Sequence, residues 1–66
     1  MKNSIKVERA KKNITQAELA KQAKVSRQTI NAIEAGKYVP SALLALRLAR
    51  YFDTTVEAIF QLEEGE

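Results

Sequence analysis

The segment TQAELAKQAKVSRQTINAIEAG, residues 15–36, decides the fold because it encodes two short helices joined by a tight turn. The first helix is predicted over residues 16–23. Thr15 and Glu18 have capping-box spacing, so the threonine oxygen can accept from the backbone N–H of Glu18 while the glutamate reaches back. The apolar side of this helix consists of Leu19, Ala20 and Ala23.

The second helix of this segment is expected to begin after Ser26, which is the next N-cap candidate. It should end near Gly36, since glycine readily adopts the left-handed conformation that follows many helices. Ile30 and Ile33 are three residues apart and predict its buried side. Only residues 24–25 lie between the two helices, so the connection must be a tight turn.

Three further helices are predicted around this segment. One covers residues 4–12, with an apolar side formed by Val7, Ala10 and Ile14. The strong break GKYVP at residues 36–40 precedes Ser41, which can cap a fourth helix. The apolar side of that helix consists of Leu44, Ala45, Leu48 and Phe52. Thr54 or Thr55 can then cap a short fifth helix at residues 56–59.

The composition is that of a small chain whose core cannot be stabilised by disulfides. A domain of 66 residues buries only about 60 % of the surface that its unfolded chain exposes. Because the chain has no Cys and no His, we expect no disulfide, no metal and no cofactor, so tight packing or self-association must add stability. No apolar stretch approaches the ~20 residues that span a bilayer. These features predict a soluble, cytoplasmic chain of one domain, residues 1–66, with no membrane partner and no evident small-molecule ligand.

The charge is unevenly distributed along the chain. The net charge is +3, but residues 1–37 carry nine Lys or Arg against three Glu, and residues 38–66 carry two Arg against five acidic residues. A basic half can bind phosphate groups while the acidic half does not. A solvated lysine-rich surface gives the same pattern, so charge alone does not decide between the two interpretations.

The helix after Ser26 carries exposed side chains that can read DNA. If its isoleucines point inward, the outward residues near its start are Arg27, Gln28, Asn31 and Ala32. Arginine can form two hydrogen bonds with guanine, and glutamine can do so with adenine. The positive partial charge of the helix N-terminus also favours phosphate. The alternative is that these side chains are only solvated surface and that Ser26 is only a helix cap.

The sequence resembles the phage-repressor/Cro-type (XRE) family of helix-turn-helix regulators over residues 5–61. The resemblance rests on TQAELA, VSRQTINAIEAGKYVPS, LALRLARYF and EAIFQ. It implies an all-α, five-helix, lambda-repressor-like domain with its helix-turn-helix at about residues 16–35. It also implies a sequence-specific, DNA-binding transcriptional regulator, expected to be a repressor, whose partner is double-stranded DNA.

The resemblance also implies roles for individual residues. The base-facing positions would be Arg27, Gln28 and Ala32, and the phosphate contacts would be Gln16, Asn31, Lys37 and Tyr38. Gln16 would in addition brace Gln28. Glu34 resembles the semi-buried structural glutamate of the family. For Tyr38, packing on its own loop is an equal alternative.

Two residues depart from the family pattern. Lys24 stands where the family usually has glycine, at a backbone position that often needs a positive φ, and a lysine there costs roughly 1 kcal/mol if the conformation is left-handed. A slightly different turn, or a phosphate contact by Lys24, are the alternatives. Glu8 stands where a larger apolar residue is common, on a side of the first helix that we expect to be partly buried.

The end of the chain predicts a homodimer. Residues 59–62 are apolar and alternate like a strand, and short family members with a similar ending pair their chain ends into a small antiparallel sheet near a two-fold interface. Residues 1–4 could supply the facing strand. A monomer is expected to expose Phe60 and Leu62, so the predicted dimer interface consists of Ile59, Phe60, Leu62 and Leu43. A symmetric dimer would bind an inverted-repeat operator.

Two other function classes were weighed against a DNA-binding regulator. An antitoxin-like or adapter module that binds a protein partner, with secondary DNA binding, is the alternative, although only four residues follow Leu62, where such proteins usually have a longer extension. An enzyme is not expected, because the chain has no His, no Cys and no Gly-rich phosphate loop.

Overall fold

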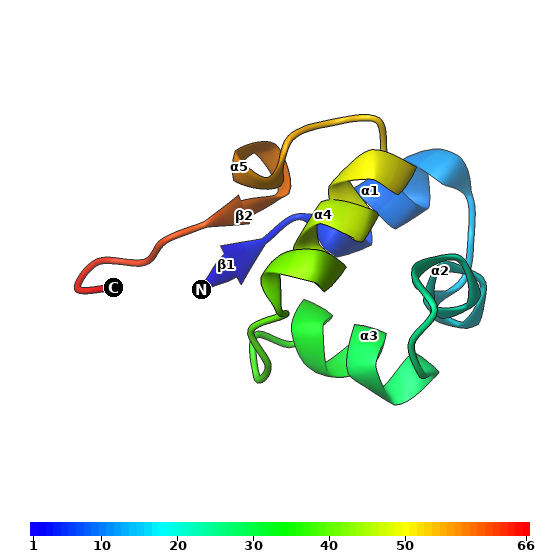
Figure 1. Cartoon of the computed structure of the whole chain (residues 1–66), viewed down its shortest axis with the longest axis horizontal. Coiled ribbons are helices and arrows are strands. Elements are labelled where there is room, and N and C mark those ends of the chain that lie inside the picture. The colour runs from blue at the N-terminus through cyan, green and yellow to red at the C-terminus, as the bar shows by residue number, and fades with distance from the viewer.

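The computed structural model describes residues 1–66 and contains five helices and two short strands (Figure 1). In chain order these are β1 (Lys2–Asn3), α1 (Ile5–Lys12), α2 (Gln16–Ala23), α3 (Arg27–Glu34), α4 (Ala42–Tyr51), α5 (Val56–Ile59) and β2 (Phe60–Gln61). The predicted all-α, five-helix domain with a terminal strand pair is therefore confirmed. None of these helices is long and apolar enough to cross a membrane.

Four of the five helices begin at a hydroxyl residue that the sequence singled out. The oxygens of Thr15, Ser26, Ser41 and Thr55 each accept a hydrogen bond from the backbone N–H three residues further on, over 3.1, 3.1, 3.2 and 3.2 Å. Such caps satisfy N–H groups that a helix leaves unpaired in its first turn. Of the two candidates for α5, Thr55 is the cap, and its partner is the N–H of Ala58 rather than of Glu57.

The core is one cluster of thirteen buried apolar residues that all five helices and β2 contribute to or border. Its members are Ile5, Leu19, Ala20, Ala23, Ile30, Ile33, Leu44, Ala45, Leu48, Ala49, Phe52, Ile59 and Phe60. Val25, in the turn between α2 and α3, packs against it, as does Ile14. Every side chain predicted for the apolar sides of α2, α3 and α4 is buried.

The predicted apolar side of α1 is wrong in two of its three residues. Ile5 is fully buried, whereas Val7 and Ala10 are exposed. Successive residues of a helix are rotated by about 100°, so a helix that buries Ile5 turns Val7 about 200° away. Glu8 is partly exposed and forms an ion pair with Lys11 over 3.2 Å, so its carboxylate does not enter the core.

The chain ends form the two-stranded antiparallel sheet, in which Lys2 pairs with Gln61 and Asn3 with Phe60. The backbone N–H of Ser4 donates to the carbonyl of Ile59 over 3.0 Å and extends the contact. The expected strand pairing is thus confirmed, and it forms within one chain.

This pairing corrects the predicted dimer interface. Ile59 and Phe60 are only 1 % and 7 % exposed in a single chain, because α5 and the strand pair hold them against the core. The expectation that a monomer exposes Phe60 is therefore wrong, and an aspartate there would place a charge in the core. Of the four predicted interface residues, Leu62 and Leu43 are exposed, at 73 % and 59 %.

Candidate nucleic-acid interface

The outer side of α3 is the candidate surface for reading DNA. Arg27, Gln28 and Asn31 are exposed on it and Ala32 is half-buried, while Ile30 and Ile33 point into the core. The arrangement follows from the helical period, since residues three and four apart share a face. Figure 1 shows α3 along one edge of the molecule, where no other element covers it.

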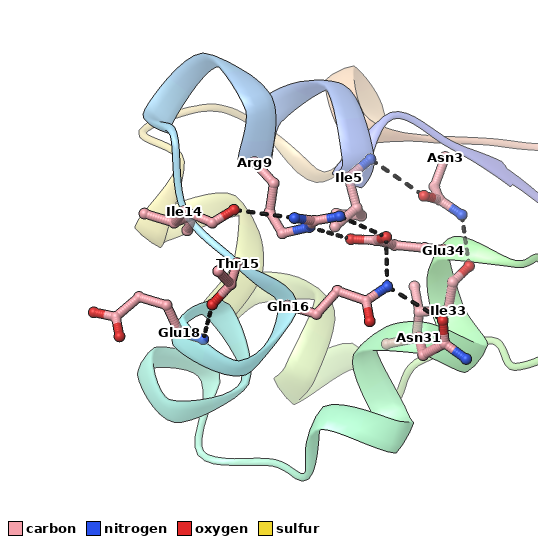
Figure 2. A network of polar contacts seen from close by, with 10 residues as sticks. All are labelled: Asn3, Ile5, Arg9, Ile14, Thr15, Gln16, Glu18, Asn31, Ile33 and Glu34. Atoms are coloured by element: carbon pink, nitrogen blue, oxygen red, sulfur yellow. Dashed lines mark hydrogen bonds and ion pairs between the residues drawn. The ribbon is translucent and has the colours of Figure 1, made fainter.

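Gln16 links the start of α2 to the second half of α3. Its amide nitrogen donates to the side-chain oxygen of Asn31 over 3.2 Å and to the carboxylate of Glu34 over 2.9 Å (Figure 2). In the free chain Gln16 is therefore bonded to Asn31 and Glu34, and the expected brace to Gln28 is not among its hydrogen bonds. The carboxylate of Glu34 is the stronger acceptor because it is charged, and it lies six residues after Gln28, nearly two helical turns further along α3.

Glu34 is the centre of this network and pairs with Arg9 of α1. Arg9 donates through Nε to one carboxylate oxygen over 2.6 Å and through a terminal nitrogen to the other over 3.1 Å. Its remaining terminal nitrogen donates to the carbonyl of Ile14 over 3.0 Å. The Arg9 and Glu34 side chains are 16 % and 7 % exposed, so the pair is largely shielded from water.

The network changes the pKa of both partners. Burial raises the pKa of Glu34, but the hydrogen bonds from Arg9 and Gln16 and the charges of Arg9 and Lys6 outweigh it, so that the pKa lies below its ordinary value. The hydrogen bond to Glu34 raises the pKa of Arg9. Both groups are therefore charged at neutral pH, and the semi-buried, structural role expected for Glu34 agrees with its geometry.

Asn3 forms a second anchor at the C-terminal end of α3. Its side-chain nitrogen donates to the carbonyl of Ile33 over 2.8 Å, and its side-chain oxygen accepts from the N–H of Ile5 over 3.2 Å (Figure 2). One side chain thus adds a second donor to the carbonyl of Ile33, which also accepts from the N–H of Gly36, and pairs a free N–H of α1. The strand pair and α3 are tied together through it.

The turn before α3 contains the strained residue that the sequence suggested. Lys24 has φ 61° and ψ 42°, in the left-handed region that glycine adopts without cost. The N–H groups of Lys24 and Val25 donate to the carbonyls of Lys21 and Ala20, which closes α2. The left-handed turn expected of the family is therefore kept with lysine in place of glycine.

The loop after α3 carries the last predicted contacts. Gly36 has φ 75° and lets the chain reverse, as the N–H of Lys37 donates to the carbonyl of Ala32 over 2.9 Å. Lys37 and Tyr38 are exposed, as a phosphate contact requires. The predicted site residues thus lie at both ends of α3, on its outer side and at the start of α2.

Sequence reasoning missed Arg9 and Asn3. A signal for Arg9 existed, because a glutamate expected to be semi-buried needs a cation, and Arg9 is four residues from Ile5 and so shares its side of α1. Asn3 offered no such signal, since its partner is a backbone carbonyl thirty residues away.

Comparison with known proteins places this geometry in a family. A family model described as helix-turn-helix matches residues 5–59. A protein of Methanocaldococcus jannaschii is 53 % identical over the full length of both chains, and one of Archaeoglobus fulgidus is 50 % identical over this whole chain and 93 % of its own. One of Bacillus subtilis is 47 % identical over 97 % of each chain. All three are named uncharacterized HTH-type transcriptional regulators. The chain belongs to the helix-turn-helix family of the phage-repressor/Cro (XRE) type.

Proposed function

We propose that this protein is a DNA-binding transcriptional regulator that represses by binding an inverted-repeat operator as a homodimer. The observation that carries the proposal is the exposed outer side of α3, with Arg27 and Gln28 free to reach base edges, on a helix that Arg9, Gln16 and Asn3 fix at its other end. The names of the relatives point to the same role, and such a role is one of binding rather than catalysis.

Phosphate contacts would flank this base-reading surface. A polar hollow of ≈ 370 Å³ lies between α1 and α3, and its lining consists of Lys6, Arg9, Gln16, Asn31, Glu34 and Ala35. Two cations and one carboxylate leave this hollow with a positive charge, which suits a phosphate group beside Gln16 and Asn31. Lys37 and Tyr38 would contact the backbone at the other end of α3. These contacts position the protein, and the contacts of Arg27, Gln28 and Ala32 to bases would select the sequence.

The homodimer follows from the small size of α3. A helix of eight residues can contact only a few base pairs, too few to specify one site in a genome. A two-fold dimer doubles the contacts and places the second α3 about 34 Å away, one turn of the duplex. Leu43 and Leu62 are the exposed apolar residues that we retain in its interface.

Selection of bound duplexes from a random-sequence pool tests the proposal. We expect an enriched inverted repeat with half-sites about one helical turn apart, and an affinity for it that falls steeply as salt is added, because several phosphates are neutralised. Enrichment of no sequence at all would contradict DNA reading, and enrichment of single, unrepeated half-sites would contradict the dimer. A reporter gene downstream of the selected repeat should then be less expressed when the protein is present.

A further inference from the structure

The solvent side of α4 is an unpartnered stripe that combines apolar and basic residues. Leu44, Ala45, Leu48 and Ala49 face the core, which leaves Leu43, Leu46, Arg47 and Arg50 exposed at helical spacing. Leu43 and Leu46 are 59 % and 60 % exposed. The cations in the ion pairs of this chain are Met1, Arg9 and Lys11, so neither arginine of α4 has an acidic partner.

A shallow groove of ≈ 490 Å³ continues this stripe. Its apolar part consists of Leu46, Ala49 and Val56, and its polar rim consists of Arg50, Thr54, Thr55 and Glu57. The groove lies between the second half of α4 and the segment that leads into α5. The groove can therefore take an apolar side chain, and the charged groups on its rim are one cation, Arg50, and one carboxylate, Glu57.

The segment after β2, residues 62–66, has the complementary character. Leu62 is 73 % exposed and is followed by Glu63, Glu64 and Glu66. Figure 1 shows this segment leaving β2 and running away from the helical body. Its only ion pairs join Glu63 and Glu66 to the amino group of Met1 in exposed positions, where such pairs contribute little free energy.

We propose that residues 62–66 of one protomer dock on the α4 stripe of a second copy, with Leu62 against Leu43 and Leu46 and the glutamates beside Arg47 and Arg50. The strand pair directs the segment away from the helices of its own chain, so it does not pack against them. A two-fold axis repeats the contact, because each protomer supplies both an acidic segment and a basic stripe. This inference rests on the homodimer of the proposed function and names its surface.

The position of this surface is compatible with DNA binding. In Figure 1 the segment after β2 extends along the longest axis of the molecule, whereas α3 lies along a different edge. The segment itself therefore does not cover α3. Arg47 and Arg50 are the only Lys or Arg residues in residues 38–66 and are not among the residues proposed to contact DNA.

Exchange of charge between two variants tests the contact, by sedimentation equilibrium in the absence of DNA. The first variant is Arg47→Glu/Arg50→Glu and the second is Glu63→Lys/Glu64→Lys. Each alone should dimerise on the order of 100-fold more weakly, because like charges face each other twice across the two-fold axis. An equimolar mixture should recover a dimer of about wild-type strength, since opposite charges then meet in both contacts. The acidic segment of the first variant faces the basic stripe of the second, and the lysine segment of the second faces the glutamate stripe of the first.

The control is Lys21→Glu/Lys24→Glu, which changes the net charge as much as the first variant does and should leave the dimer unchanged. The inference is overturned if the wild type is monomeric at tens of micromolar, if either reversal leaves the dimer intact, or if the mixture stays monomeric. Circular dichroism of each variant checks that it is folded. Binding of the selected duplex is measured separately, so loss of DNA reading and loss of this interface give different results.

Discussion

The two halves of α3 differ in how many other elements of the chain hold them. The C-terminal half is held from three directions, by Arg9 from α1, by Gln16 from α2 and by Asn3 from β1. The N-terminal half carries Arg27 and Gln28, which are exposed, and is held mainly by its Ser26 cap and its buried isoleucine.

The difference teaches how a very small domain can combine rigidity with recognition. A side chain committed to an internal hydrogen bond is less available to a base edge, so the residues that fix α3 and those that read DNA must be separate. Along α3, Arg27 and Gln28 precede the anchored residues Ile33 and Glu34 by about one and a half to two helical turns. Asn31 lies at the boundary, because it is exposed and yet accepts a hydrogen bond from Gln16.

Removing the carboxylate of Glu34 should have the largest effect on this arrangement. Glu34→Ala leaves Arg9 shielded from water without its acidic partner, and we expect the free energy of unfolding to fall by about 3 kcal/mol, the lower end of the range for broken buried pairs. Denaturant unfolding measures this loss. DNA binding should fall along with it, because α3 is no longer held.

A double variant sharpens this prediction. Arg9→Met/Glu34→Leu removes both charges and should be more stable than Glu34→Ala, since no uncompensated charge remains. Glu18→Ala, which changes an exposed glutamate outside the proposed dimer contact, is the control and should change stability far less. If Glu34→Ala were as stable as the wild type, the C-terminal half of α3 would not depend on the network.

Low pH should lower the free energy of unfolding by weakening the pair of Arg9 and Glu34, and by less than Glu34→Ala does. The pKa of Glu34 lies below its ordinary value of 4.5, so its pair with Arg9 stabilises the fold fully above that pH. The contribution is lost as the pH falls below 4.5 and through the lowered pKa. The loss is smaller than for Glu34→Ala, because a protonated carboxyl still fills its space and forms hydrogen bonds.

The pH dependence is isolated by comparing the wild type with Glu34→Gln. The difference between their free energies of unfolding should be largest near neutral pH and should shrink as the pH falls below 4.5 and through the lowered pKa of Glu34. Glu18→Gln, at an exposed glutamate outside the proposed dimer contact, should follow the wild type throughout. A difference that stays constant with pH would mean that the charge of Glu34 does not stabilise the fold.

Substitution of Gln28 tests the N-terminal half of α3, which carries the side chains that we propose to read bases. Gln28→Ala should leave stability unchanged but cost about 1–3 kcal/mol of binding to the selected duplex, with relaxed preference at one position in each half-site. Lys37→Ala should instead weaken binding to all sequences alike and reduce the salt dependence. Gln22→Ala, an exposed glutamine of α2, is the matched control. If Gln28→Ala kept the base preference of the wild type, residues other than Gln28 would have to read the bases.

The sequence predicted those features of the fold that depend on near neighbours. The caps at Thr15, Ser26, Ser41 and Thr55 act over three residues, so the pattern alone places them. The apolar sides of α2 to α4 follow from helical period. For α1 the same reasoning failed, because its apolar residues are few and the burial of Ile5 is set by the other helices rather than by its own pattern.

The features that escaped prediction depend on contacts between distant residues. Arg9 and Glu34 are separated by 25 residues, and Asn3 and Ile33 by 30. Phe60 was expected to be exposed in a monomer although residues 1–4 were expected as a facing strand, because the sequence does not show that Asn3 of the same chain pairs with Phe60 and that Phe60 packs against the core. Residue types limit such contacts, but only the packing of the helices decides which of them form.

The smallest expected change in stability is at Lys24, which lies in the turn just before the N-terminal half of α3. Its left-handed conformation is strained for lysine, so Lys24→Gly should stabilise the fold, by up to about 1 kcal/mol after the greater freedom of glycine in the unfolded chain is counted. Lys24→Ala removes the same side chain but keeps a Cβ, and should bring no such gain. If both variants lost DNA affinity equally, Lys24 would be a phosphate contact that offsets its strain. If both variants kept their DNA affinity, Lys24 would not contact DNA and its strain would simply be tolerated in the turn. If Lys24→Ala stabilised the fold as much as Lys24→Gly, backbone strain at this position would be contradicted.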